Sequence, residues 1–295
     1  MTINCNLCPR RCGADRTKSV GFCGAGSTVK LGLVSLHQWE EPCLVGSHGA
    51  GTVFFSHCTM RCVFCQNHEI SAEGFGFDVT IERLSEIFIE QQERGAANIE
   101  LVTPTHYTDQ IIDALTLARA DGLTLPIVWN SNGYELPSTI ERLKNFVDIW
   151  LPDLKYFDER IAIEYSSAPN YFEQASRAIE AMFEQVGAPI FDGDQMKRGV
   201  IVRHLVLPNH RHDSMKIIDW LHKNFGDDIY ISLMNQYTPM FRADRFKKIN
   251  RRLTTFEYQS VVDHAVELGI KNCFVQTSGA ASKEFVPTFD GRFIF

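Results

Sequence analysis

The chain has 295 residues, of which 44% are hydrophobic and 22% are charged, and its formal net charge is −7. This composition is sufficient for one large core, and an α/β barrel of this length is often a single domain. The acidic balance argues against nucleic acid or an anionic membrane as a partner. The chain has no apolar stretch long enough to span a bilayer, and its first residues lack the regions of a signal peptide. We therefore expect a soluble, cytoplasmic protein.

Nine cysteines are many for a chain of this kind. Disulfides are disfavoured in a reducing compartment, and seven of the nine thiols fall into two clusters, which favours metal ligation. We interpret Cys43 and Cys273 as single packed thiols, with Cys43 also a candidate extra ligand.

The first fifty residues are rich in Gly and Cys and look like loops. We treat residues 1–50 as a Cys-rich N-terminal extension and residues 51–295 as the core. A segment without an apolar core of its own could be stabilised by a bound metal, and four thiolates suffice for structural zinc. We therefore favour zinc over a second iron–sulfur cluster here, with free thiols in a mobile arm as the alternative. The four thiols are spaced C-x2-C-x3-C-x10-C and belong to Cys5, Cys8, Cys12 and Cys23.

From residue 52 onward, strand and helix signals alternate. The polar segment 187–199 is predicted to be a connection. The regular alternation predicts parallel strands with crossover helices, and too few units for a full barrel. The expected fold is therefore α/β, an incomplete (β/α)6 TIM-like barrel. In chain order the predicted elements are strand 52–55, helix 79–94, strand 98–103, helix 108–120, strand 126–129, helix 137–145, strand 147–151, helix 171–186, strand 199–206, helix 214–225, strand 229–234, helix 254–268 and a further strand at 271–276.

Directly after the first strand of this series come Cys58, Cys62 and Cys65, spaced C-x3-C-x2-C. Three thiolates are one short of a closed tetrahedral site or of an ordinary iron–sulfur cubane. If the loop binds a 4Fe–4S cluster, one iron is free to bind a small molecule. Two alternatives stay open on spacing alone, namely packed thiols or a zinc completed by His57 or His68.

Polar residues follow each predicted strand, at the face where barrel enzymes have their sites. Each also has a simpler interpretation, such as a helix cap for Asp153, a solvated charge for Lys155, or satisfied structural histidines for His106 and His204. The candidates at this rim are Thr103, Thr105, Asn130, Asn132, Asp153, Lys155 and Arg203.

With these residues in view, the chain resembles the radical S-adenosylmethionine (SAM) superfamily. The resemblance rests on Cys58, Cys62 and Cys65, with aromatic Phe64 before the last cysteine. It is closest to the branch similar to pyruvate formate-lyase activating enzyme, and it covers nearly the whole chain. The further matching segments are 8–13, 39–42, 103–107, 151–156 and 202–208.

The resemblance implies a partial barrel with a 4Fe–4S cluster on the three cysteines and SAM on the open iron. An electron from reduced flavodoxin or ferredoxin would cleave SAM to methionine and a 5′-deoxyadenosyl radical. That radical would abstract hydrogen from a substrate, with a glycyl radical protein as one candidate. The alternatives are radical modification of a small molecule or another macromolecule. From a different class come a non-catalytic electron carrier and a zinc-stabilised binding module.

The resemblance also implies roles for individual residues. Asp153 and Lys155 match a segment that contacts SAM, and Phe64 matches the aromatic near the adenine. One departure is that the usual Gly-Gly-Glu after the second strand is absent. Thr103 or Thr105 would then accept the hydrogen bond from the methionine amino group, but neither side chain carries a charge. Asn130, Asn132 and Arg203 complete the expected cofactor contacts, and we assign no catalytic residue.

Overall fold

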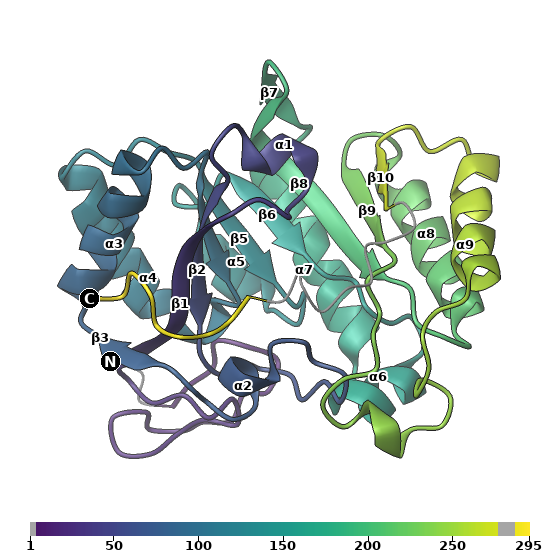
Figure 1. Ribbon diagram of the computed structural model, residues 1–295, viewed down its shortest axis with the longest axis horizontal. Helices are drawn as coiled ribbons and strands as arrows, with labels where there is room; N and C mark the ends of the chain where they lie inside the picture. The colour runs from purple at the N-terminus through teal and green to yellow at the C-terminus, as the bar shows by residue number, and fades with distance from the viewer. Residues whose placement is uncertain (1–3, 277–286) are drawn as a thin grey trace.

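The structure is a computed structural model that describes residues 4–276 and 287–295. Its centre is a sheet of parallel strands that curves without closing, so the α/β partial barrel predicted from the sequence is confirmed (Figure 1). All seven strands of the predicted series are present. In spatial order they are β2 (Ala50–Phe55), β4 (Ile99–Val102), β5 (Ile127–Ser131), β6 (Ile149–Pro152), β8 (Gln195–Leu205), β9 (Tyr230–Met234) and β10 (Cys273–Val275).

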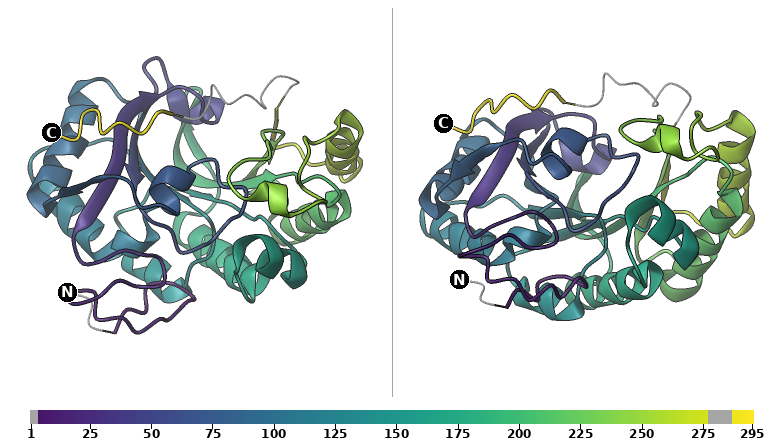
Figure 2. Two further views of the ribbon diagram at one scale, coloured as in Figure 1. Left: turned by 60° about the horizontal axis from the view of Figure 1, so that its bottom comes forward. Right: turned by 90° about the horizontal axis from the view of Figure 1, so that it is seen from below.

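The long helices lie in an arc along the outer face of this sheet, as Figure 2 shows in its right-hand view. Their positions follow the predicted alternation, with short connections between strand and helix. A helix at α6 (Glu159–Ser166) was not predicted. The other helices of the arc are α3 (Ile81–Glu93), α4 (Thr108–Ala120), α5 (Pro137–Arg142), α7 (Tyr171–Val186), α8 (Arg211–Phe225) and α9 (Thr255–Glu267).

The N-terminal extension contributes to the sheet, which corrects the prediction that residues 1–50 are loop-like. Strand β1 (Val29–His37) pairs antiparallel with β2, and β3 (Phe77–Val79) pairs with the far edge of β1. The polar connection 187–199 is also ordered, since β7 (Ile190–Asp192) forms a hairpin with the start of β8. A division at residue 50 thus separates two stretches of sequence that share one sheet.

Successive side chains of each parallel strand point to opposite faces of the sheet. In β5, Trp129 packs in the core under the helices, whereas Val128 lies in a separate apolar cluster on the inner face. Short helix α1 (Pro42–Val45) adds Cys43 and Leu44 to that inner cluster. The amino end of the inner face is therefore filled with apolar side chains, and polar residues begin further along the strands.

The two ends of the strands differ in what covers them (Figure 1). Helix α1 and the β7 hairpin lie at the amino end, while α2 (His68–Ser71) and the loops after the strands lie at the carboxyl end. Residues 287–295 cross β1, and the Phe289 ring meets Phe54 of β2 at 5.6 Å between centroids. Among the helices in the described residues, none combines the length and apolar character that a membrane crossing needs.

The turn after β5 generates a test of how tightly this end is packed. Gly133 has a φ of +74°, and a Cβ built there would lie 2.1 Å from the Asp153 carbonyl oxygen. Gly122 also has a left-handed φ, of +99°, but a Cβ there would meet nothing within 4 Å. We expect Gly122→Ala to cost only the left-handed backbone strain, about 1 kcal/mol. Gly133→Ala should lower the free energy of urea-induced unfolding by clearly more. Equal losses would contradict the close approach of the two turns.

Candidate functional site

The cysteine loop begins where β2 ends, at the carboxyl edge of the parallel strands. The chain turns at His57, whose φ of 75° lies in the left-handed region. Cys58, Cys62 and Cys65 follow, and all three are partly buried. Burial raises the pKa of both the Cys58 and the Cys62 thiol to about 11. Their thiolates therefore need nearby hydrogen-bond donors, positive charge or a metal to be stable.

Each of the three sulfur atoms has a side-chain hydrogen-bond partner from a different element. The partners come from the turn after β5, the end of α6 and helix α2. Hydrogen bonds to sulfur ligands orient and tune iron–sulfur clusters, so this donor set fits a 4Fe–4S group on the three thiols. The pairs are Asn132 Nδ2 with Cys58 Sγ (3.3 Å), Ser166 Oγ with Cys62 Sγ (3.0 Å) and the Ser71 hydroxyl with Cys65 Sγ (3.1 Å).

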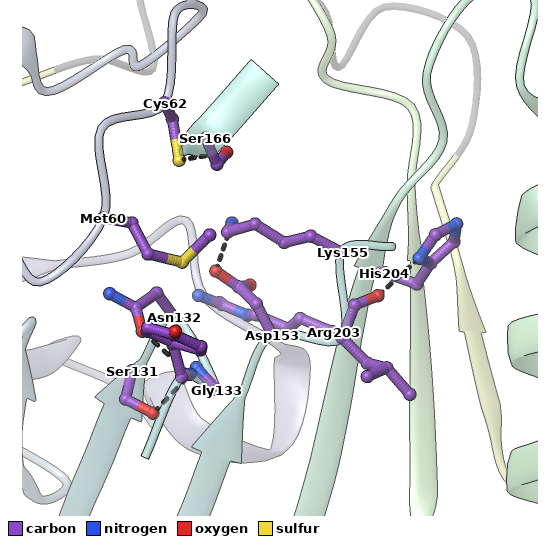
Figure 3. A network of polar contacts seen from close by, with 12 residues as sticks. Met60, Cys62, Ser131, Asn132, Gly133, Asp153, Lys155, Ser166, Arg203 and His204 are labelled. Carbon is purple, nitrogen blue, oxygen red and sulfur yellow. Dashed lines mark hydrogen bonds and ion pairs between the residues drawn. The ribbon is translucent and has the colours of Figure 1, made fainter. Parts of the chain in front are cut away.

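A charged pair lies beside this loop (Figure 3). Lys155 Nζ is 2.5 Å from Asp153 Oδ2, and both side chains are less than one-fifth exposed. Burial alone lowers the pKa of Lys155, but Asp153 and the Cys62 thiol outweigh that effect and raise it. Lys155 is therefore a cation whose charge favours the thiolate forms of the nearby cysteines. The sequence prediction that these residues share a rim with the cysteine loop agrees with their positions.

The other predicted contacts lie at the same end, and most are already engaged. The Thr105 hydroxyl donates to buried Glu135 at 2.8 Å. Asn130 Nδ2 donates to Glu100 Oε1 at 2.6 Å on the inner face. Thr103 is half-buried just after β4. The ring of buried Phe64 meets the Tyr237 ring edge-on, with 5.6 Å between centroids. Thus the candidates gather at one end, but not all of them line an open surface.

The Arg203 guanidinium contacts two carboxylates from the N-terminal extension. Its Nε donates to Glu41 Oε1 at 2.8 Å, and its Nη2 contacts both Glu40 and Glu41. Glu100 completes this charge cluster. Burial, followed by the Glu40 carboxylate, raises the pKa of Glu100 well above its usual range. Arg203 is thus satisfied within the protein, although its backbone pairs with Asp153 at the carboxyl end of the strands.

Two histidines of the rim have structural roles, as the simpler interpretation predicted. His106 Nε2 bonds the Ser56 carbonyl oxygen at 2.8 Å, and His204 Nδ1 bonds the Leu154 carbonyl oxygen at 2.7 Å. Burial lowers the pKa of His106 to about 3 and that of His204 to about 4. Both rings are therefore neutral and fix the ends of strands next to the site.

The histidines considered as a fourth ligand have other partners. The His68 ring stacks on Phe241, with 4.9 Å between centroids, and its Nδ1 lies 3.1 Å from Glu73 Oε1. The His57 ring lies against Gly24 and Gly74, so close that a Cβ at either glycine would clash with it. Both rings are therefore in contact with residues outside the segment from Cys58 to Cys65.

The cysteines of the N-terminal extension lie near one another. The sulfur atoms of Cys12 and Cys23 both lie beside Gly21. Burial, with a smaller effect of the Cys23, Cys5 and Cys12 thiols, raises the pKa of Cys8 to about 12. Within the described residues, no group of three or more His, Cys, Asp or Glu side chains is arranged as a ready metal site. Metal binding at either cysteine set requires deprotonation of its thiols.

Sequence reasoning missed the residues that support the ligands. Ser71 and Ser166 reach two of the sulfurs, although nothing in their sequence context sets them apart from other serines. Glu40 and Glu41 belong to a segment that supported the resemblance, but no role was predicted for them. Acidic residues next to Pro42 in a Gly-rich extension would have been a usable signal only if their burial had been known.

The buried charge cluster generates a pH prediction. Because Glu100 keeps its proton to a higher pH in the folded than in the unfolded chain, stability falls as pH rises above about 4.3, the unfolded pKa of Glu. The loss is about 1.4 kcal/mol per pH unit until the folded pKa is reached. Glu100→Gln removes this loss, so its melting temperature relative to the parent should rise between pH 5 and pH 8. Glu180→Gln, exposed on α7, is the control. A constant difference across this range would contradict a neutral Glu100.

Comparison with known proteins agrees with this geometry. The family model of the Radical SAM superfamily matches residues 52–221. The uncharacterized protein MJ0674 of Methanocaldococcus jannaschii is 32% identical over 277 residues, covering 89% of this chain and 74% of that protein.

Solved structures show the same fold at low identity. SuiB of Streptococcus suis bound to the precursor peptide SuiA is 13% identical with a TM-score of 0.51, covering 76% of this chain and 47% of SuiB. Coproporphyrinogen III oxidase (HemN) from Escherichia coli, a radical SAM enzyme, is 13% identical with a TM-score of 0.50, covering 71% and 49%. The chain thus spans about half the length of these structures. Membership of this superfamily implies SAM and a 4Fe–4S cluster as cofactors. On the family match and the cysteine site together, the chain belongs to the radical SAM superfamily.

Proposed function

We propose that this protein is an enzyme that uses a 4Fe–4S cluster to cleave SAM by one electron, giving methionine and a 5′-deoxyadenosyl radical that abstracts hydrogen from a substrate. The observation that carries the proposal is the set of three thiols, each with its own hydrogen-bond partner, beside the Lys155–Asp153 pair. A carrier of electrons alone has no use for an incomplete thiol set next to groups suited to carboxylate and hydroxyl recognition. This contrast favours the enzyme over the electron carrier.

Lys155 and Asp153 supply the charges for SAM. The Lys155 ammonium pairs with the methionine carboxylate, and the Asp153 carboxylate accepts hydrogen bonds from ribose hydroxyls or from the amino group. Their partial burial strengthens both contacts, because fixed charges interact more strongly away from water. Since the two side chains already pair with each other, SAM binding exchanges that contact for two new ones.

The remaining contacts are proposed from the same end of the strands. Asn132 donates to the Cys58 sulfur and to Thr59 Oγ1 at 2.9 Å, so it supports the ligand loop as well as facing SAM. Thr103 or Thr105 accepts a hydrogen bond from the methionine amino group, and Phe64 lies near the adenine. Because Thr105 donates its own proton to Glu135, its oxygen lone pairs stay free to accept.

The identity of the substrate stays a prediction from the resemblance. A glycyl radical protein, a small molecule and another macromolecule are all compatible with the radical chemistry, because the cysteine loop determines how the radical forms and not where it goes. The proposed electron donor is a reduced flavodoxin or ferredoxin. The similarity to pyruvate formate-lyase activating enzyme is likewise a prediction about the branch of the superfamily.

The decisive test is anaerobic reconstitution with iron and sulfide, followed by dithionite and SAM. We expect 5′-deoxyadenosine from the parent and from Cys273→Ala, a single thiol in β10. We expect Cys62→Ala to lose most of its iron and to form product at least about 100-fold more slowly, as for loss of a metal ligand. A parent that contains a cubane yet forms no 5′-deoxyadenosine would refute the proposal. Turnover retained by Cys62→Ala would refute the ligand assignment.

The same metal analysis addresses the N-terminal thiols, where zinc remains our proposal. A variant with Cys58, Cys62 and Cys65 all changed to Ala leaves only the N-terminal set. Zinc in that variant supports a structural zinc, iron with sulfide supports a second cluster, and neither metal supports free thiols.

The N-terminal extension also contacts the cysteine loop through Arg10. Its Nε donates to the Thr59 carbonyl oxygen at 2.9 Å, and its Nη1 donates to the Ser167 carbonyl oxygen at 2.5 Å. Thr59 follows Cys58, and Ser167 follows the serine that donates to the Cys62 sulfur. Its guanidinium lies over the Phe22 ring, 4.0 Å from the centroid. Arg10 is therefore proposed as a positioning residue for two of the three ligands.

This proposal predicts a graded effect of substitution. Arg10→Ala should lower iron content and 5′-deoxyadenosine formation by about tenfold, the low end for a residue that supports metal ligands. Arg10→Lys should recover little, because an ammonium cannot reproduce the planar fork that reaches two carbonyl groups. The electron paramagnetic resonance spectrum of the reduced cluster should change in both variants. Arg11→Ala, at the exposed neighbouring position, is the control. An unchanged spectrum in Arg10→Ala would exclude the positioning role.

A further inference from the structure

The segment 236–252, between β9 and α9, covers the cysteine loop from outside. The Arg242 amide donates to the Val63 carbonyl oxygen at 2.8 Å, and Gln66 Nε2 donates to the Gln236 carbonyl oxygen at 3.2 Å. Phe241 and Arg242 line a small cavity together with Cys62. Figure 2 shows the segment, in light green, at the same end as the cysteine loop. This segment is therefore in direct contact with the ligand loop.

The segment has a charge opposite to that of the whole chain. Positions 242–252 contain six basic residues and one acidic residue, whereas the chain has a net charge of −7. Arg251 pairs with Glu257 at 2.7 Å, so its charge is compensated. The other five are exposed, and we call them the basic face. They are Arg242, Arg245, Lys247, Lys248 and Arg252.

Apolar residues fix the segment so that these cations face outward. Ala243 and Ile249 are fully buried, and the Phe246 ring meets the Tyr165 ring at 5.5 Å between centroids. Phe241 has a φ of 55°, an unfavourable conformation for a residue with a Cβ, and its ring stacks on His68. Such strained positions persist where the surrounding structure over-determines them and concentrate at functional sites. The basic face is thus held in place rather than free to collapse onto nearby acids.

We propose that the basic face docks an acidic protein that carries one low-potential electron and delivers it to the cluster bound at Cys58, Cys62 and Cys65. The inference rests on the proposed function and names the docking surface of its electron donor. The carrier loses one electron and is oxidised, and the cluster gains that electron and is reduced. The step therefore balances without a further reactant. The donor is a flavin or iron–sulfur protein of the kind named above.

Charge and place together select this partner. Complementary charge steers an acidic protein toward the basic face and accelerates association at low salt. A basic patch could also attract RNA, but RNA gains nothing from contact with the ligand loop. An electron carrier does gain from that contact, because the rate of electron transfer falls steeply with the distance between donor and acceptor.

The primary test measures binding rather than turnover. Oxidised flavodoxin is titrated into the reconstituted protein at 50 and 300 mM salt by isothermal titration calorimetry. The variant Arg245→Glu/Lys247→Glu/Lys248→Glu should raise the Kd at 50 mM salt at least about tenfold, and lose most of the salt dependence. The matched control is Lys144→Glu/Lys223→Glu/Lys271→Glu, three exposed positions that lead into the amino ends of strands. It should leave the Kd within about twofold, since those lysines lie toward the opposite end of the strands, and exposed charges further apart than the Debye length, roughly 14 Å at 50 mM salt, are largely screened.

A second measurement separates this inference from the proposed function. With dithionite, a small reductant that needs no docking, the triple variant should form 5′-deoxyadenosine at the parental rate, which also reports correct folding. With reduced flavodoxin it should be slower by the same factor as its Kd. An unchanged Kd, an equal loss in the control, or weakened binding of an oligoribonucleotide in place of flavodoxin overturns the docking surface. Failure of the parent with dithionite instead overturns the proposed function, while the Kd comparison still decides the docking surface.

Discussion

The negative charge of three thiolates in a partly buried loop is the constraint on which this structure depends. Water cannot fully stabilise that charge, so the protein must supply donors and cations from elsewhere. They come from α2, from the turns after β5 and β6, and from the end of α6. Because these elements are far apart in sequence, the ligand loop has its shape only when the parallel sheet has formed. Fold and site are therefore one structure, and the loop is not an independent motif.

The N-terminal extension supports the barrel at two levels. Near its start, Arg10 contacts the outside of the ligand loop. Near its end, Glu40 and Glu41 pair with Arg203 on the inner face. Helix α1 adds apolar side chains to the inner cluster next to this pairing. A buried ion pair of this kind contributes little net stability, but removal of one partner is costly. The extension therefore determines how deep the polar part of the inner face reaches.

The strand order and most helices were predictable from the sequence, because period-2 and period-3.6 apolar patterns alternate from residue 52 onward. Helix α9 begins with a capping box between Thr254 and Glu257, a start signal that is visible in the sequence. Strand β1 was missed because its residues lie among cysteines and glycines that suggested loops. The ligand-supporting serines Ser71 and Ser166 were beyond prediction, since their role arises from tertiary proximity alone. Arg203 was expected at the rim from its segment, and its backbone does pair with Asp153 there, but the pairing of its side chain with Glu41 could not be predicted.

The contact between Arg10 and the Ser167 carbonyl oxygen spans 157 positions of the chain. During synthesis at 5–20 residues per second, Ser167 follows Arg10 by roughly 8–30 s. The Cys-rich segment thus cannot form this contact until β6 and α6 have been synthesised. Over that interval the ribosome-bound chain presents both cysteine sets to the iron-delivery and oxidation chemistry of its surroundings. In the maturation of this protein, late folding therefore competes with earlier reaction of the cysteines with iron or oxidants.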